Sequence, residues 1–292
     1  MHTDLSGKTF VVTGATSGIG FAVAELLARQ GAAVIGVGRS AERCRQAEAH
    51  LRRLPAGAPV HYLLADLSVQ SEVQRLAGEI RGQLEADGKS WLDGLVNNAA
   101  TFTYWLALTP DGIETQWAVN HLAAFALTRR LLPLLLAAPA ARVVTVSSDS
   151  HYGARLDWDD LQLRRRYNAL RAYGNTKLAN VLFTLELNRR LGPDASLRAF
   201  AADPGLVKTD IALKGNPAVA RWVWKLRRSG GVPPEQAALG VVSLLAEPNL
   251  GGSGEVYWKD GRPKRPSRRA LDIEAAARLW QVSEQMCDEV EA

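Results

Sequence analysis

Cysteine is scarce in this 292-residue chain, which has only two, Cys44 and Cys287. They lie far apart in the sequence, and neither is flanked by residues at the spacing of metal ligands. The sequence therefore predicts neither a disulfide framework nor a zinc site, and we expect no metal. A chain with so few thiols fits a reducing compartment, so we expect a cytoplasmic protein.

Long hydrophobic runs are also lacking. Residues 1–8 have no apolar signal core, and the longest apolar run, 131–138, contains Pro133. A membrane-spanning helix needs about 20 predominantly apolar residues. We therefore expect a soluble protein with no stable membrane insertion.

Signatures of nucleic-acid binding are absent as well. The net charge is +5, but the basic residues are scattered, with concentrations only at 164–166, 225–228 and 264–269. No helix-turn-helix, zinc-finger or aromatic RNA-binding pattern accompanies them. We expect solvated basic faces and no nucleic-acid partner, while the surplus of Lys and Arg also suits a polyanionic nucleotide.

A glycine-rich turn at 13–20 is the most informative stretch, because it lies between an apolar run at 10–12 and an amphipathic run from Phe21. Strand, turn and helix in this order open a dinucleotide-binding unit. The first glycine allows a tight exit from the strand, the second a close approach of backbone to phosphate, and the third close helix packing. The expected contacts are Gly14, Ser17, Gly18, Ile19 and Gly20, with a helix from about Ile19 attracting the anion.

The residues that follow predict the fold. Gly31 ends the helix and 33–37 reads as a second buried strand, so the unit closes in about 30 residues. Apolar strands at 60–65, 94–96 and 142–146 alternate with helical stretches. The sequence predicts a single α/β domain over 1–292, with a Rossmann-like doubly wound parallel sheet and helices on both faces.

The turn after the second strand, Gly38-Arg39-Ser40, bears on nucleotide specificity. An acidic side chain there would accept from a ribose 2′-OH, whereas an arginine matches a 2′-phosphate. No Asp or Glu occupies this turn. We expect Arg39 to favour NADP(H) over NAD(H), the alternative being a solvated arginine at a strand end.

Polar or small residues follow the next two strands. Asp66 and Leu67 end the third strand, and Asp66 either bonds the adenine amino group or serves as a turn or helix-cap residue. Asn97 and Ala99 follow the fourth strand, where an amide can brace neighbouring strands and alanine leaves room for a ribose. We expect all four residues to contact the cofactor.

Four residues suggest catalysis. Asn120 stands in a predicted helical stretch, 109–132, as either a satisfied structural amide or a local break that frees a carbonyl. Ser148 ends the strand at 142–146, and Tyr173 and Lys177 share one helix face. A hydroxyl, a phenol and an ammonium beside a nicotinamide make a carbonyl-reduction site. Ser148 would bond the substrate oxygen, and Lys177 with an oxidised nicotinamide would make Tyr173 easier to deprotonate.

Together these motifs, in this order from about Leu5 to Tyr257, resemble the short-chain dehydrogenase/reductase family. The resemblance implies a catalytic tetrad of Asn120, Ser148, Tyr173 and Lys177. Tyr173 would be the proton donor, Lys177 would bind the nicotinamide ribose and support ionisation of the tyrosine, and Asn120 would hold a water in a proton relay. The resemblance also places Pro204, Gly205, Val207 and Thr209 along the nicotinamide end of the cofactor.

Within the family, the chain most resembles the retinol dehydrogenase and WW-domain oxidoreductase branch, with light-dependent protochlorophyllide reductase more distant. Residues 114–122, 177–184 and 277–283 carry this likeness, and the long spacer from Ser148 to Tyr173 fits it. Ala100 stands where the family usually has glycine.

The substrate side is less defined. Aromatic residues follow active-site motifs in three segments, at Tyr104 and Trp105, Tyr152 and Trp158, and Trp222 and Trp224. They indicate an apolar substrate, aromatic or polycyclic, unless they fill the core instead. We expect a substrate lid at about 206–232 hinged at Gly230-Gly231, or alternatively an amphipathic helix resting on a membrane surface. A C-terminal helix is expected at about 271–290.

The sequence thus predicts an NADP(H)-dependent oxidoreductase that transfers hydride between the nicotinamide and a carbonyl or secondary alcohol of a small molecule. A non-catalytic NADP(H)-binding sensor or scaffold with the same fold is the alternative class. The sequence leaves open whether the protein forms a homo-oligomer, and it does not identify the substrate.

Overall fold

The computed structural model describes residues 3–207, 231–247, 250 and 254–291. Within them the strands form one eight-stranded sheet in the order β3-β2-β1-β4-β5-β6-β7-β8. Neighbouring strands are parallel except β7 and β8, which form an antiparallel hairpin. The strands are β1 (Thr9–Thr13), β2 (Ala33–Gly38), β3 (Val60–Leu64), β4 (Gly94–Asn97), β5 (Arg142–Val146), β6 (Arg198–Asp203), β7 (Tyr257–Lys259) and β8 (Arg262–Pro263).

The strand order reverses at β1, which pairs with β2 on one side and β4 on the other. Connections leaving the carboxyl ends of these strands diverge there, and ligands bind in the crevice that results. The sheet confirms the predicted doubly wound α/β fold. It also places the glycine-rich turn, which follows β1, at this crevice.

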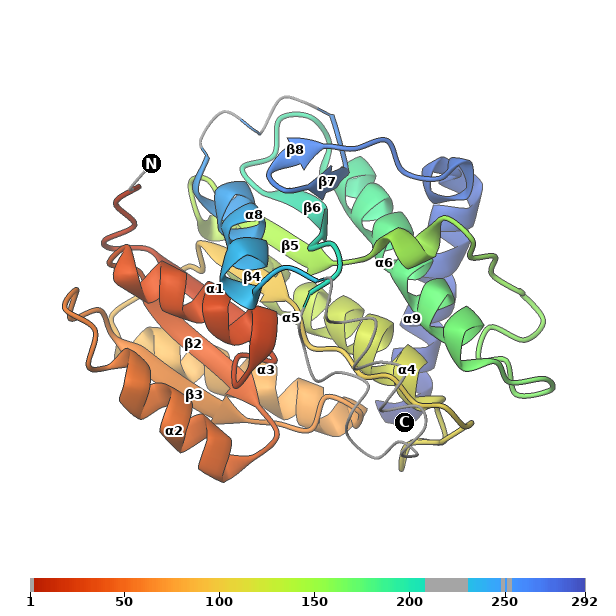
Figure 1. Ribbon diagram of the computed structural model, residues 1–292, viewed down its shortest axis with the longest axis horizontal. Coiled ribbons are helices and arrows are strands. Elements are labelled where there is room, and N and C mark those ends of the chain that lie inside the picture. The colour runs from red at the N-terminus through yellow and green to blue at the C-terminus, as the bar shows by residue number, and fades with distance from the viewer. Residues whose placement is uncertain (1–2, 208–230, 248–249, 251–253, 292) are drawn as a thin grey trace.

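Helices cover both faces of the sheet (Figure 1). On one face lie α1 (Gly18–Arg29), α2 (Ala41–Leu51) and α8 (Pro234–Ala246), and on the other lie α3 (Gln70–Ala86), α5 (Ala123–Ala137), α6 (Ala169–Leu191) and α9 (Ile273–Glu291). In β1, Phe10 and Val12 pack with the first group and Val11 with the second. Both sides of this strand are buried, which explains its continuous apolar run.

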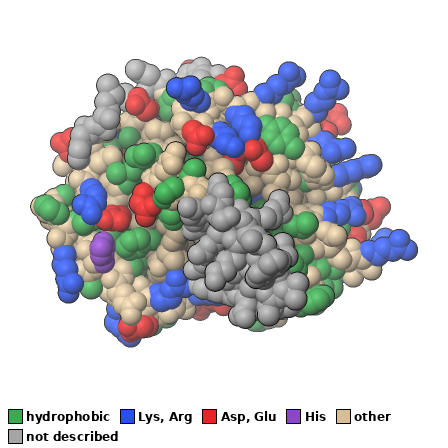
Figure 2. All heavy atoms as spheres, in the orientation of Figure 1, with side chains coloured by type: hydrophobic (Ala, Val, Ile, Leu, Met, Phe, Trp, Pro, Cys, Tyr) green, Lys and Arg blue, Asp and Glu red, His purple; other side chains and the backbone are tan. Residues whose placement is uncertain are grey.

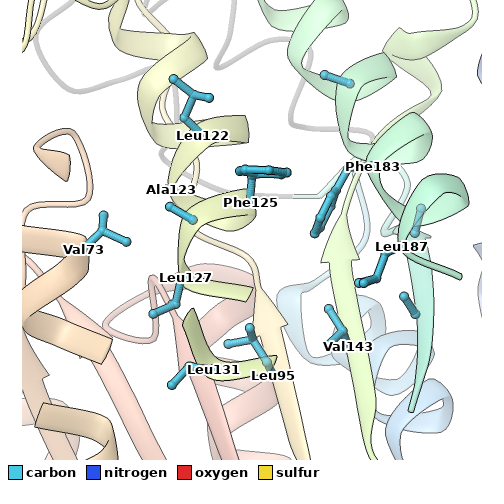
Figure 3. Close-up of a cluster of buried hydrophobic side chains, with 14 of the residues drawn as sticks. Val73, Leu95, Leu122, Ala123, Phe125, Leu127, Leu131, Val143, Phe183 and Leu187 are labelled. Carbon is cyan, nitrogen blue, oxygen red and sulfur yellow. The ribbon is translucent and has the colours of Figure 1, made fainter. Parts of the chain in front are cut away.

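Aromatic side chains join the helices of the second face (Figure 3). Phe125 of α5 and Phe183 of α6 meet edge to face with ring centroids 5.7 Å apart. Trp280 of α9 packs against both rings, at 5.0 and 5.9 Å. The C-terminal helix is therefore part of the core and is fixed to α5 and α6.

The helix predicted over 109–132 begins later in the structure. Thr109 and Ile113 close a turn instead, in which the Thr109 N–H donates to the Ile113 carbonyl at 2.8 Å. Glu114 then caps the helix start, because its carboxylate accepts from the N–H groups two and three residues later. The chain runs through α4 (Thr115–Trp117) and the π-helical η1 (Ala118–Leu122) into α5.

Near the C-terminus, the chain forms β7, a turn at Asp260-Gly261 and then α9, which corresponds to the helix expected at about 271–290. The helix and the Gly230 hinge expected inside the 206–232 lid lie outside the described residues. The two ends of that segment meet, since Val207 and Val232 form a parallel bridge.

The length of the apolar helices and the distribution of surface charge concern possible contacts with membranes and charged partners. No helix in the described part of the chain combines the length and apolar character needed to cross a bilayer. On the face shown in Figure 2, Lys and Arg side chains lie around the rim with Asp and Glu among them.

Candidate active site

A cavity of about 880 Å³ opens at the carboxyl ends of the strands, where the turns after β1 to β6 converge with α6. Most predicted site residues line it: Gly14, Ser17, Gly18, Ile19, Arg39, Asp66, Leu67, Ala99, Ser148, Tyr173, Lys177, Pro204, Gly205 and Val207. Three do not, namely Gly20, Asn97 and Asn120. Thr209 lies outside the described residues.

The glycine-rich turn is shaped by close backbone contacts. Gly14 has a φ of +66°, and a Cβ there would lie 2.9 Å from the Ala99 Cα. A Cβ on Gly20 would meet Asn98 Nδ2 at 2.3 Å, so the missing side chain lets α1 pack closely on the turn. Gly20 itself does not line the cavity. Ser17, the N-cap residue of α1, makes no side-chain capping bond. The first-turn N–H groups are thereby left for an anion.

One end of the cavity carries two arginines. Arg39 follows β2, and Arg43 lines the same cavity from the first turn of α2. Ser40 caps this helix, its Oγ accepting from the Arg43 N–H at 3.5 Å. Arg43 was not predicted, although it stands four residues after Arg39, at the start of the helix that follows the same strand. Two guanidinium groups at one end of a cavity suit a phosphate.

Asp66 is a turn residue, one of the two roles that the sequence left open, and it lies where the other role would need it. Its Oδ1 accepts from the Ser68 N–H at 3.0 Å, which makes it a turn residue. It also lines the cavity together with Leu67. The carboxylate is thus held in place by the turn and stays available to a donor in the cavity.

Asn97 does not contact the cavity, contrary to the prediction. Its Nδ2 donates to the hydroxyls of Thr128 and Thr145 at 2.9 and 3.4 Å, and the residue is 5% exposed. It braces β4 against β5 and α5, because side chains alternate in direction along a strand. The next residue, Asn98, lines the cavity instead and donates to the Thr13 carbonyl at 2.8 Å.

Ser148, Tyr173 and Lys177 come together at one wall of the cavity. Ser148 follows β5 and caps the short helix η2 (Asp149–His151), its Oγ accepting from the Ser150 N–H at 3.2 Å. Tyr173 and Lys177 lie one turn apart inside α6, on one face of the helix as predicted. The Lys177 Nζ lies 5.3 Å from the Tyr173 ring centroid and donates to the Val146 carbonyl at 2.9 Å.

The pKa of Tyr173 is shifted upward, opposite to the predicted direction. Burial of the phenol, with a smaller contribution from the Asp203 carboxylate, raises its pKa to about 12. Burial also lowers the pKa of the Lys177 ammonium to about 8. Desolvation penalises the charged form of each group, whereas the predicted lowering for Tyr173 was to come from Lys177 and an oxidised nicotinamide together. Tyr173 is consequently a neutral phenol at neutral pH.

Asn120 combines the two alternatives that the sequence allowed. Its amide is satisfied by the backbone of Thr101, with Oδ1 accepting at 2.7 Å and Nδ2 donating at 3.0 Å. The local break is present too, because Asn120 lies in the π-helical η1. The Asn120 carbonyl accepts from Asn180 Nδ2 at 2.9 Å. Asn120 therefore fixes the Thr101 wall of the cavity rather than lining it.

A buried hydrogen-bond chain extends from there to α9. Asn180 Oδ1 accepts from His121 Nδ1 at 3.3 Å, and His121 Nε2 lies 2.9 Å from Ser283 Oγ. Burial lowers the pKa of His121 to about 4, so the imidazole is neutral and Ser283 donates to it. Asn180 also donates to the Val146 carbonyl, at 3.3 Å, which Lys177 shares. The sequence analysis assigned these three residues no role, although each falls in a segment that carries the family likeness.

The substrate end of the cavity differs from the aromatic wall that the sequence predicted. Tyr104, Trp105, Tyr152 and Trp158 do not line it, and Trp222 and Trp224 lie outside the described residues. The lining there comprises Thr101, Phe102, Val119, Ala154, Leu170, Arg171 and Leu206. Phe102, which the sequence analysis missed, packs edge to face on Tyr173 at 5.8 Å. The wall is mainly apolar, with one aromatic ring beside the phenol.

Comparison with known proteins identifies the family. Residues 8–219 match the family model described as short chain dehydrogenase. Human retinol dehydrogenase 13 is 34% identical over 285 residues, which are 94% of this chain and 83% of the relative. The human WW domain-containing oxidoreductase is 35% identical over 298 residues, covering 98% of this chain and 69% of the relative.

Solved structures agree. An uncharacterized protein from Mycobacterium paratuberculosis superposes with a TM-score of 0.74 at 36% identity, covering 98% of this chain and 95% of that one. A short chain dehydrogenase from Escherichia coli CFT073, complexed with NADPH, gives 0.68 at 25% identity over 89% and 99% of the two chains. Landomycin C-6 ketoreductase LanV, with bound NADP and rabelomycin, gives 0.66 at 26% identity over 88% and 96%. The chain therefore belongs to the short-chain dehydrogenase/reductase family, with relatives in the retinol dehydrogenase and WW-domain oxidoreductase branch that its sequence resembles.

Proposed function

We propose that this protein is an NADP(H)-dependent oxidoreductase that transfers hydride between the nicotinamide and a carbonyl or secondary alcohol carbon. The observation that carries the proposal is the continuity of one cavity. Its lining runs from the arginines at positions 39 and 43, past the glycine-rich turn, to Ser148, Tyr173 and Lys177. A cavity of about 880 Å³ is large enough for a nucleotide and part of a substrate.

The residues present fit NADP(H). Arg39 and Arg43 would bind the 2′-phosphate, the turn at 14–19 would bind the pyrophosphate, and Asp66 would bind the adenine. Ala99 and Lys177 would adjoin the nicotinamide ribose, and Pro204, Gly205 and Val207 the nicotinamide. The cradle depends on glycine, because a Cβ at Gly14 would meet the Ala99 Cα at 2.9 Å. The two structural relatives described with NADPH or NADP support the same cofactor.

When bound, the cofactor supplies the hydride. The chain supplies the proton and the groups that stabilise charge during its transfer. Tyr173 is protonated at neutral pH because burial raises its pKa to about 12, so it is ready to donate to a carbonyl oxygen. Ser148 would hydrogen-bond that oxygen as charge develops on it. Lys177 would hold the ribose and offset charge on the tyrosine. These properties favour reduction over oxidation.

An apolar substrate, aromatic or polycyclic, suits the wall next to Tyr173. Phe102, Leu170 and Val119 line it, and the ring of Phe102 packs on the phenol. LanV is described as a ketoreductase with bound rabelomycin.

We assign the protein to the cytoplasm, since both cysteines are free and buried and so suit a reducing compartment.

The test compares NADPH and NADH consumption on a panel of aldehydes, simple ketones and bulky aromatic or polycyclic ketones. We expect turnover with NADPH on the bulky ketones, and a loss of about 10²- to 10⁴-fold in Tyr173→Phe. The variant should still bind NADPH, which separates loss of the proton donor from loss of the site. Tight NADPH binding without turnover on any carbonyl would instead favour the sensor or scaffold class.

A further inference from the structure

Four charged side chains meet beside the active site, on the edge formed by β6, β7 and β8. Lys259 Nζ lies 3.2 Å from an Asp149 oxygen and 3.4 Å from an Asp203 oxygen. Lys264 Nζ lies 2.5 Å from Asp149 and 3.6 Å from Asp203. Each lysine therefore bridges both carboxylates.

The two carboxylates belong to two turns that both contribute to the lining of the cavity. Asp149 directly follows Ser148 and opens η2. Asp203 ends β6 and directly precedes Pro204, and its Oδ1 accepts from the Gly205 N–H at 2.9 Å. Ser148, Pro204 and Gly205 all line the cavity. The lysine bridges thus connect the turn of the proposed catalytic serine to the turn proposed to face the nicotinamide.

The β7–β8 hairpin is built to present both lysines together. Lys259 is the direct partner of Asp203 in the parallel register of β6 and β7. The Lys264 N–H donates to the Tyr257 carbonyl at 2.9 Å, which fixes the return strand. The Tyr257 hydroxyl donates to Asp149 Oδ1 at 3.1 Å. Three groups of one hairpin therefore converge on Asp149.

Burial makes this pairing necessary for Asp203, which is 3% exposed. A buried carboxylate without a cation is strongly destabilising, and burial raises the pKa of Asp203 above its ordinary value. Asp149 is different, because 47% of its side chain is exposed. Losing the Asp149 carboxylate would leave Asp203 with both of its cations, so the bridge can be cut there without stranding a buried charge.

We propose that Lys259 and Lys264 are positioning residues that, by bridging Asp149 to Asp203, fix the Ser148 turn relative to the Pro204-Gly205 turn. This inference rests on the proposed function, since the spacing matters only if both turns act on one cofactor–substrate pair. The alternative is a purely structural cluster that holds the hairpin on the sheet.

The experiment measures NADPH binding by nicotinamide fluorescence, and the thermal unfolding midpoint, in five proteins. They are the wild type, Asp149→Asn, the double variants Lys259→Met/Lys264→Met and Lys259→Arg/Lys264→Arg, and the control Arg262→Met. The control removes one positive charge from an exposed site on the same hairpin. Where a panel ketone is turned over, KM for NADPH and kcat are measured separately.

We expect Asp149→Asn to weaken NADPH binding about tenfold and to lower kcat, while its unfolding midpoint falls much less than that of the double lysine variant, because Asp203 keeps both of its cations. The double lysine variant should weaken binding at least as much and lose stability as well. Lys259→Arg/Lys264→Arg, which keeps both charges, should restore binding, and Arg262→Met should match the wild type.

The inference is overturned if folded Asp149→Asn binds NADPH with wild-type affinity and the same emission spectrum. This holds even if the double lysine variant fails to fold, because Asp149→Asn alone decides between positioning and mere stability. A wild-type protein that binds neither NADPH nor NADH would overturn the proposed function, and this inference with it.

Discussion

The two ends of the cavity are built from different materials. The end proposed to bind the nucleotide is made of three short turns, each continuous in sequence, at 14–19, 38–43 and 66–68, and it offers backbone N–H groups, two arginines and one carboxylate. The end proposed to bind the substrate is made of side chains from distant segments, such as Phe102, Leu170 and Leu206. The shape of the first end follows from local geometry, whereas the shape of the second depends on how remote loops pack.

This difference explains why the nucleotide end could be predicted from the sequence and the substrate end could not. Glycine at 14 and 20 is required by contacts within a single strand-turn-helix unit and its neighbouring turn. The placement of Phe102 on Tyr173 instead depends on the path of a loop held by Asn120. Changes at the nucleotide end should affect cofactor affinity, whereas changes at the substrate end should affect only particular substrates.

The largest effect is expected from removing both arginines of the nucleotide end. Charge-assisted hydrogen bonds contribute about 1.5–3 kcal/mol each, so Arg39→Met/Arg43→Met should weaken NADPH binding about a hundredfold or more. NADH binding should change little, because NADH lacks the 2′-phosphate. Calorimetric titration of both nucleotides checks this, and equal losses for NADPH and NADH would show that the arginines do not read the phosphate.

A methyl group at Gly20 should distort the nucleotide end of the cavity, because the site has no room for it. The added Cβ would lie 2.3 Å from Asn98 Nδ2 and 2.5 Å from the Gly14 carbonyl. Overpacking of this kind costs about 1–3 kcal/mol, so Gly20→Ala should lower both the unfolding midpoint and NADPH affinity. The matched control is Gly78→Ala in α3, where nothing lies within 4 Å of the new Cβ. The control should leave binding intact and stabilise slightly, by about 0.5–1 kcal/mol.

Lys177 lines the cavity between the two ends, and its buried ammonium group should lower the free energy of unfolding. Its pKa falls from 10.5 to about 8 on folding, so between these values the unfolded chain binds more protons than the folded one. The free energy of unfolding then rises with pH across that window, by about 1–3 kcal/mol from this group. Lys177→Met should remove that rise and be more stable than the wild type at pH 7, though inactive. Urea unfolding of both proteins at pH 7 and 10 measures it, and parallel pH dependence would contradict the shift.

The smallest effect is expected at the substrate end. Phe102→Ala removes a ring that packs on Tyr173 at 5.8 Å, and such aromatic pairs contribute about 0.5–1.5 kcal/mol. KM for bulky aromatic ketones should rise about three- to tenfold, while NADPH affinity stays unchanged. Steady-state kinetics with one bulky and one small ketone tests this, and an equal change for both would remove Phe102 from substrate recognition.

Much of the architecture could be predicted because it follows from local patterns. Apolar strands alternating with helices predicted the doubly wound sheet, and strand ends predicted where Asp66, Ser148 and the glycine-rich turn would gather. The misses have both tertiary and local causes. Asn97 points away from the cavity because of the register of β4, and burial of Tyr173 raises the pKa of its phenol. The stretch 109–113 folds as a turn for a local reason, because Glu114 caps the helix later.

The most direct test of the account is the transfer of a labelled hydride. The wild-type protein is given NADPH deuterated at both positions of the nicotinamide C4, together with the bulky ketone that it consumes fastest, and the product alcohol is analysed by mass spectrometry. Hydride transfer with Tyr173 as the proton donor predicts one deuterium at the carbinol carbon, and labelled product that forms about 10²- to 10⁴-fold more slowly with Tyr173→Phe. An unlabelled alcohol, or labelling by Tyr173→Phe at the wild-type rate, would contradict this mechanism.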